Sequence, residues 1–147
     1  MTQEDKDLLL KDLCGRLPYG VKIQTPTNCW TSEIDIRELK EIFKGDDGLF
    51  RIGDVGAIIE YSKPYLFPMS SMTKEQEKEI SERYNYHNYF GLCIEITNHS
   101  EGYWDKDTSC NLQDYLWLED WYNKNHFDYR GLIEKGLALD ATNLNIY

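Results

Sequence analysis

The sequence predicts one α+β domain, residues 1–147, with an antiparallel sheet of four to five short strands, curled or barrel-like, and about three helices. Short apolar segments divided by turn signals fill the region from Val21 to Tyr61, with no stretch of helical length among them. Helical spacing of apolar residues occurs instead near both ends of the chain. A chain of this length buries roughly 68–70% of its unfolded surface, which is enough for one hydrophobic core.

The first predicted helix runs from Thr2 to Cys14. Thr2 and Asp5 have the spacing of a capping box, in which each side chain accepts a hydrogen bond from the other residue's backbone nitrogen. Gly15 is the expected end of this helix, since glycine favours the residue after a helix. The segment Leu17–Gly20 contains both proline and glycine and predicts a turn.

Alternating apolar residues predict two strands next, one from Val21 that ends at a bend or a sheet edge near Pro26, and one around Ile34. The segment Ile36–Lys44 fits a strand by alternation and a helix by its three- and four-residue spacings, so both alternatives stay open.

A hairpin is predicted for Glu41–Ile52, because Gly45–Gly48 has the composition of a tight turn between apolar segments. The most apolar strand candidate, Ala57–Tyr61, follows and runs into the segment Lys63–Thr73.

We call Lys63–Thr73 the proline segment. Pro64 and Pro68 force extended backbone, because each ring crowds the preceding residue out of the helical region. Thr73 and Gln76 have capping-box spacing and predict the start of a charged surface helix that ends at Arg83. We interpret the proline segment as a structural joint that packs against the later segment Asp128–Ile133.

A late strand is predicted at Phe90–Ile96, followed by a polar segment at Asn98–Thr108. A final aromatic helix then runs to about Asn125. Trp117 falls beside the polar face of this helix, and we expect the residues after the helix to fold back and cover its ring.

The net charge of −10 disfavours nucleic acids and anionic membranes as partners, although it also permits the alternative of an acidic DNA mimic. The first seven residues lack a basic signal region, and Leu8–Leu10 is too short to span a membrane. We therefore expect a cytoplasmic protein. Its four cysteines should stay reduced there, namely Cys14, Cys29, Cys93 and Cys110.

No catalytic, cofactor-binding or metal-binding residue is predicted. The three histidines, His87, His99 and His126, have no metal-ligand spacing relative to the cysteines, and no Gly-x-Ser-x-Gly elbow is present. An enzyme would need a site that assembles only in the folded chain, and a small hydrolase of this kind remains an alternative.

Aromatic residues make up 14% of the chain, and large rings anchor protein interfaces as well as cores. We expect six residues to bind a partner: Tyr65, Phe67, Tyr103, Trp104, Trp117 and Arg130. For each aromatic ring, packing in the core is the competing explanation. For Arg130 the competing explanation is an internal ion pair, with Asp128 as the nearest acid, that locks the end of the fold.

Three motifs in order, RLPYG from Arg16, KPYLFPMSSMT from Lys63 and FDYRGLIEKGLAL from Phe127, resemble a family of small uncharacterised proteins of gut Bacteroidales and their phages or mobile elements. The resemblance implies an origin but no activity. The family pattern has a basic residue where this chain has Phe67, which argues against anion binding at the proline segment.

These observations predict a non-enzymatic accessory protein of phage or mobile-element type that acts by protein–protein interaction. The sequence predicts neither the identity of the partner nor the oligomeric state.

Overall fold

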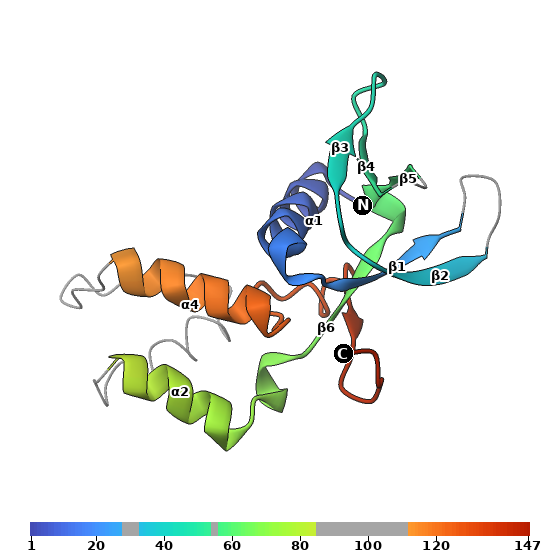
Figure 1. The fold of residues 1–147 in the computed structure, drawn as a ribbon. Coiled ribbons are helices and arrows are strands. Elements are labelled where there is room, and N and C mark those ends of the chain that lie inside the picture. Colours follow the sequence, from blue (N-terminus) through green and yellow to red (C-terminus); the bar gives the residue numbers. More distant parts are fainter. Residues whose placement is uncertain (28–32, 54–55, 85–111) are drawn as a thin grey trace.

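The computed structural model describes residues 1–27, 33–53, 56–84 and 112–147, and it confirms the α+β fold (Figure 1). Its helices are α1 (Gln3–Arg16), α2 (Lys74–Tyr84) and α4 (Leu112–Lys124). Its strands are β1 (Lys22–Pro26), β2 (Ile34–Glu38), β3 (Ile42–Lys44), β4 (Phe50–Ile52), β5 (Ala57–Ile58), β6 (Lys63–Leu66) and β7 (Leu139–Asp140). The described residues also form the short 3-10 helices η1 (Leu17–Tyr19), η2 (Ile59–Tyr61) and η3 (Met69–Ser71).

These strands form two sheets, one with the order β2-β1-β6-β7 and one with the order β3-β4-β5. The curled or barrel-like form expected for the sheet does not occur among the described residues, because the strands divide between two open sheets. Pairing is antiparallel except between β6 and β7, which are parallel. In Figure 1, β6 crosses the middle of the molecule between α1 on one side and the β1–β2 hairpin on the other.

Helix α1 begins at the predicted capping box, where the backbone nitrogens of Thr2 and Asp5 each donate to the other side chain over 3.1 Å. The predicted end of this helix is wrong, because the helix continues through Gly15 to Arg16. A Cβ atom on Gly15 would lie 3.0 Å from the side-chain nitrogen Nδ2 of Asn123 in α4. The glycine therefore allows two helices to approach closely instead of ending one of them.

The open choice at Ile36–Lys44 is settled as strand, since β2 covers its start and β3 its end. The predicted hairpin is confirmed by β3 and β4, and the Gly48 nitrogen donates to the Gly45 carbonyl over 2.9 Å in its turn. The predicted strand Ala57–Tyr61 is only partly correct. It ends at Ile58, because a 3-10 turn redirects the chain from the second sheet into β6.

The proline segment is extended from Lys63 to Pro68, as predicted, and its first four residues are strand β6 in the interior of a sheet. The prediction is wrong for Met69–Ser71, which form the 3-10 helix η3. Pro64 lies opposite Ile23 of β1. The backbone N–H and C=O of Ile23 point toward β2 and not toward β6, so this is a non-hydrogen-bonded pair. The missing N–H of Pro64 therefore removes no hydrogen bond to β1. On its other side, β7 pairs only with Tyr65 and Leu66. A proline is therefore tolerated between two strands.

Phe67, directly after β6, pairs with the chain after α4. The Phe67 nitrogen donates to the His126 carbonyl over 2.9 Å, and the Asp128 nitrogen donates to the Phe67 carbonyl over 2.8 Å. The predicted joint thus exists and begins two residues before the predicted segment. The capping box of Thr73 and Gln76 then starts α2, with bonds of 2.9 and 3.3 Å.

Helices α2 and α4 lie side by side and share an aromatic core (Figure 1). Ile80 of α2 is buried there with Trp121, Tyr122 and Phe127, and the rings of Trp121 and Phe127 stack with centroids 5.7 Å apart. The chain after α4 therefore folds back on the helix, as expected. The Trp117 ring has Arg83 of α2 over it, with the guanidinium carbon 5.5 Å from the ring centroid.

A second, aliphatic core joins α1 to both sheets and to the segment before β7. Its fully buried members are Leu9, Leu13, Val21, Ile23, Leu66 and Leu132. The predicted strand at Phe90–Ile96 and the polar segment at Asn98–Thr108 lie outside the described residues. No helix in the described part of the chain is long and apolar enough to cross a membrane.

Candidate functional site

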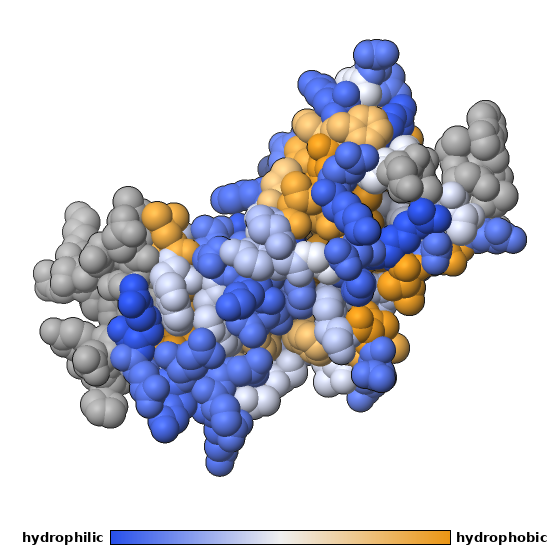
Figure 2. All heavy atoms as spheres, in the orientation of Figure 1, coloured by the Kyte–Doolittle hydropathy of each residue, from blue (hydrophilic) through white to orange (hydrophobic). Residues whose placement is uncertain are grey.

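Strand β2 is an edge strand, and its apolar side chains face solvent. Ile34 is 61% exposed and Ile36 is 47% exposed. Asp35 and Arg37, whose side chains alternate with theirs along the strand, are half-buried. The alternation that predicted a strand is therefore real, but its apolar face points outward. In Figure 2, apolar surface is visible over the β3–β4 hairpin and again where β2 lies in Figure 1.

The hydrogen bonds between β1 and β2 show which backbone groups of β2 point toward β1 and which point away from it. The Thr27 nitrogen donates to the Glu33 carbonyl and the Leu39 nitrogen to the Val21 carbonyl, both over 2.9 Å. Hydrogen-bonded and non-bonded pairs alternate in an antiparallel ladder. The odd-numbered residues of β2 thus face β1.

The even-numbered residues of β2, which are Ile34, Ile36 and Glu38, consequently direct their N–H and C=O groups to the outer edge of the sheet. In the described ranges no strand pairs with that edge. Unpaired groups in a row of this kind are a template for a further strand.

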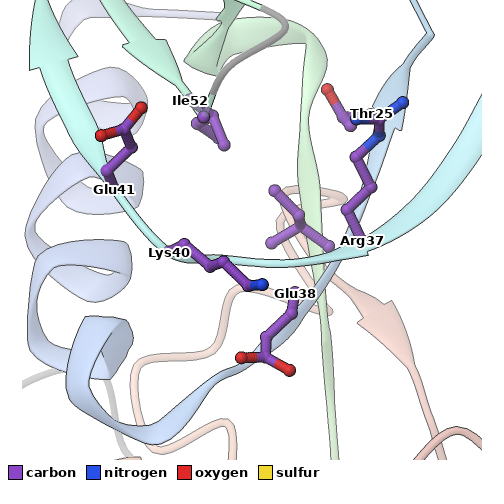
Figure 3. Close-up of a pocket in the computed structure, with 8 residues that line it drawn as sticks. Thr25, Arg37, Glu38, Lys40, Glu41 and Ile52 are labelled. Carbon is purple, nitrogen blue, oxygen red and sulfur yellow. The ribbon is translucent and has the colours of Figure 1, made fainter.

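A pocket of about 420 Å³ lies on the other face of β2 (Figure 3). Its floor is apolar and includes the buried side chains of Ile23 and Ile52. The Thr25 hydroxyl also lines it and lies 3.0 Å from the Ser62 hydroxyl, so this polar group already has a buried partner. The volume falls within the range of small-molecule sites.

Charged side chains of both signs surround the pocket. Figure 3 shows Arg37 extending toward Thr25, while Glu38, Lys40 and Glu41 lie along the chain from the end of β2 to the start of β3. The Arg37 Nε lies 3.0 Å from the Asp35 carboxylate. Such a lining suits a small polar or zwitterionic molecule better than an apolar one. Neither histidine nor cysteine is among the described lining residues.

A buried ion-pair network connects α1, α4 and the chain after α4. Asp12 and Arg16 are both fully buried, and the Asp12 carboxylate accepts from Arg16 Nε over 2.7 Å and from Arg16 Nη2 over 3.0 Å. Arg16 Nη2 also donates to the Phe127 carbonyl over 2.7 Å. Arg130 donates to Asp12 over 3.0 Å and pairs with Glu119.

Tyr129 lies inside this network. Its hydroxyl lies 3.2 Å from the Glu119 carboxylate and 3.1 Å from the Asn123 side-chain oxygen. Arg130 stacks on its ring with the guanidinium carbon 4.5 Å from the centroid. Burial is the main cause that raises the pKa of Tyr129 above its ordinary value. We interpret the network as a structural feature that holds α1, α4 and the chain after α4 together.

The described residues that the sequence analysis assigned to partner binding make internal contacts. Tyr65 is buried, and its hydroxyl lies 3.3 Å from the Gln24 side-chain oxygen. Phe67 is half-buried between the rings of Phe127 and Tyr147. Trp117 is half-buried under Arg83.

Arg130 forms the expected internal ion pairs, but with Asp12 and Glu119 instead of the predicted Asp128. Asp128 accepts from the backbone nitrogens of Leu132 and Ile133, both over 2.8 Å, and so shapes the following turn. Tyr103 and Trp104 lie outside the described residues, and their role stays a prediction.

Ile34 and Ile36 were not predicted from the sequence as part of a binding surface. Alternation shows that a strand has an apolar face, but it does not show whether that face is covered. Pro26 gave no signal for this edge, because it ends β1, which has β2 on one side and β6 on the other.

Within the described ranges, no three His, Cys, Asp or Glu side chains are grouped to hold a metal ion. His126 is described, while His87 and His99 are not. Cys14 is an exposed free cysteine, and partial desolvation of its thiol by neighbouring atoms raises its pKa. The other three cysteines lie outside the described residues.

Comparisons with models of known protein families, with curated protein sequences and with solved structures find no match to this chain.

Proposed function

We propose that this protein acts by binding another polypeptide and that the outer edge of β2 is the binding surface. The observation that carries the proposal is the outward direction of the backbone groups of Ile34, Ile36 and Glu38, beyond which no described strand lies. An extended segment can add to such an edge through backbone hydrogen bonds.

The side chains of β2 support the same surface. Ile34 and Ile36 are among the most exposed large apolar residues of the described chain. Covering apolar area stabilises a complex by roughly 25 cal/mol per Å² before the costs of association. An exposed apolar edge strand that stayed uncovered would favour aggregation.

The chemistry of the chain favours a polypeptide over other partners. A net charge of −10 repels nucleic acids, whereas β2 itself carries both an acid and a base that a peptide can complement. An accessory, non-enzymatic role in a phage or mobile element is consistent with this surface and extends the resemblance seen in the sequence motifs.

Affinity capture with matched variants tests the proposal. The wild-type chain, carried on a tag, should retain a specific polypeptide from a lysate, and Ile36→Lys should lose it because a charge interrupts the apolar row. Leu144→Lys is the matched control, since Leu144 is 43% exposed and lies outside β2. Equal capture by the wild type and Ile36→Lys would overturn the assignment of the β2 edge.

The pocket supports a second candidate, an enzyme or small-molecule-binding protein whose site assembles only in the fold. Its apolar floor and mixed charges could hold a small polar ligand. A panel of small zwitterionic molecules should then raise the melting temperature of the wild type but not of Lys40→Ala. If no compound raises the melting temperature of the wild type, this candidate loses its support.

A further inference from the structure

We infer that the partner of the β2 edge is a second copy of this chain. The two β2 strands would pair antiparallel about a twofold axis at Ile36 and join two four-stranded sheets into one. The inference rests on the proposed function, because it names the occupant of the same edge.

The backbone of β2 fits this pairing. Centring the register on Ile36 places Ile36 opposite the same residue of the second copy and Ile34 opposite Glu38. All three residues direct their backbone groups outward from β1, so each of these pairs falls at a hydrogen-bonded position.

The half-buried side chains of β2, on the face opposite to Ile34 and Ile36, are complementary in charge in the same register. Asp35 lies opposite Arg37 of the second copy, and Arg37 lies opposite Asp35. These pairs fall at non-hydrogen-bonded positions, where facing side chains are closest. Within one chain the Arg37 Nε already lies 3.0 Å from the Asp35 carboxylate, so both groups are held on one face before pairing.

Neighbouring registers are disfavoured by the same two residues. A register centred on Asp35 places two aspartates opposite each other, and one centred on Arg37 places two arginines opposite each other. Like charges directly opposite are destabilising in a sheet. The sequence Ile34–Glu38 therefore selects the register centred on Ile36.

Two chains that each carry a net charge of −10 repel one another unless the meeting surface is locally neutral. Strand β2 meets this condition. Asp35 is balanced by Arg37, and the Glu38 carboxylate lies 3.2 Å from the Lys22 ammonium of β1.

Pairing also covers the exposed isoleucines. On the outer face Ile36 meets its own copy, and Ile34 of each chain lies diagonal to Ile36 of the other, within reach of packing. The result is a row of four isoleucines across the joined sheets, Ile34 and Ile36 of each copy. The edge strands of the second sheet are shorter, with three residues in β3 and two in β5.

Sedimentation velocity over a concentration series tests the inference with charge-reversal variants. We expect the wild type to dimerise with a dissociation constant in the micromolar range, since a five-residue edge buries a small interface. D35R alone and R37D alone should dimerise about tenfold or more weakly, because each places like charges opposite one another.

An equimolar mixture of D35R and R37D should recover the dimer, because the two arginines of one chain then face the two aspartates of the other. The double variant D35R/R37D should also recover it. Lys63→Asp, which makes the same charge change as R37D at an exposed position on β6, is the matched control for R37D and should dimerise like the wild type. Circular dichroism of each variant verifies that it is folded.

A wild type that stays monomeric at millimolar concentration would overturn the inference, as would a mixture that dimerises no better than its components. If the wild type is monomeric while Ile36→Lys loses a captured polypeptide, the proposed function stands and its partner is a different protein. If the wild type is monomeric and Ile36→Lys captures as the wild type does, both fail.

Discussion

The phenol of Tyr147 donates a 2.7 Å hydrogen bond to the carbonyl oxygen of Tyr65. It also accepts a 3.0 Å hydrogen bond from the backbone nitrogen of Lys22. Continuing the register of β1 and β6 places Lys22 opposite Tyr65, so the phenol bridges the two strands where their ladder separates. Although Tyr147 is half exposed, desolvation of its hydroxyl raises the pKa of Tyr147 from 10 to about 12.

Tyr147→Phe should destabilise the fold by about 1–2 kcal/mol, because two backbone groups lose their partner. The free energy of unfolding in urea measures this effect. Tyr61→Phe is the control, since Tyr61 is 68% exposed and should change stability little. Equal stability of the two variants would show that the bridge contributes nothing.

Asp12→Ala should be among the most destabilising substitutions in the described chain. It leaves the fully buried guanidinium of Arg16 without its carboxylate, which typically costs about 3–5 kcal/mol. Chemical denaturation measures the loss. Glu60→Ala, which removes the half-buried pair of Lys6 and Glu60 at 2.8 Å, should cost less than about 1 kcal/mol, because both side chains keep contact with water. A similar cost for both variants would contradict this account of the network.

Features that depend on neighbours in the sequence were predictable. The capping boxes at Thr2 and Thr73 each need only residues within one turn, and the hairpin turn at Gly45–Gly48 is equally local. The joint between the proline segment and the chain near Asp128 was also predicted, because both segments have rings to bury.

Features that depend on distant residues were not predictable. Gly15 resembles a helix end until Asn123, more than a hundred residues away, is placed against it. Asp12 and Arg16 have the spacing of an ordinary surface ion pair, and only Phe127 and Arg130 show that they are buried. The outward face of β2 likewise depends on which strands lie beside it.

His126 should make stability depend on pH. Burial, followed by the positive charges of Arg16 and Lys22, lowers its pKa from 6.5 to about 4. The unfolded chain therefore takes up the proton first as the pH falls. Stability from this group is fully present above pH 6.5 and is lost as the pH falls toward 4. The loss should reach about 1–2 kcal/mol, since His126 is only partly buried.

Melting temperatures of the wild type and His126→Asn at pH 7 and pH 5 measure this dependence. Asparagine suits the position, because His126 has a φ of 58° and asparagine tolerates the left-handed region. The variant should lose the ring stacked on Tyr147 at 4.1 Å at both pH values, but its melting temperature should change less between them. An unchanged pH dependence would assign the effect to other groups.

Gly15→Ala should destabilise the chain although alanine is the better helix former. Alanine gains about 1 kcal/mol inside a helix. Its Cβ, however, would lie 3.0 Å from Nδ2 of the Asn123 side chain. Asn123 is buried, and its Oδ1 is held by the Tyr129 hydroxyl at 3.1 Å. The amide therefore has little freedom to move, and we expect a net loss of about 1–2 kcal/mol in the free energy of unfolding.

A double-mutant cycle with Asn123→Ala separates the two effects on Gly15. Once the amide is removed, the steric conflict disappears and only the helix propensity remains, so Gly15→Ala should become stabilising in that background. A change of sign between the two backgrounds assigns the glycine to the contact between α1 and α4. If Gly15→Ala stabilises the wild type by the same amount, the close approach of the helices does not require glycine.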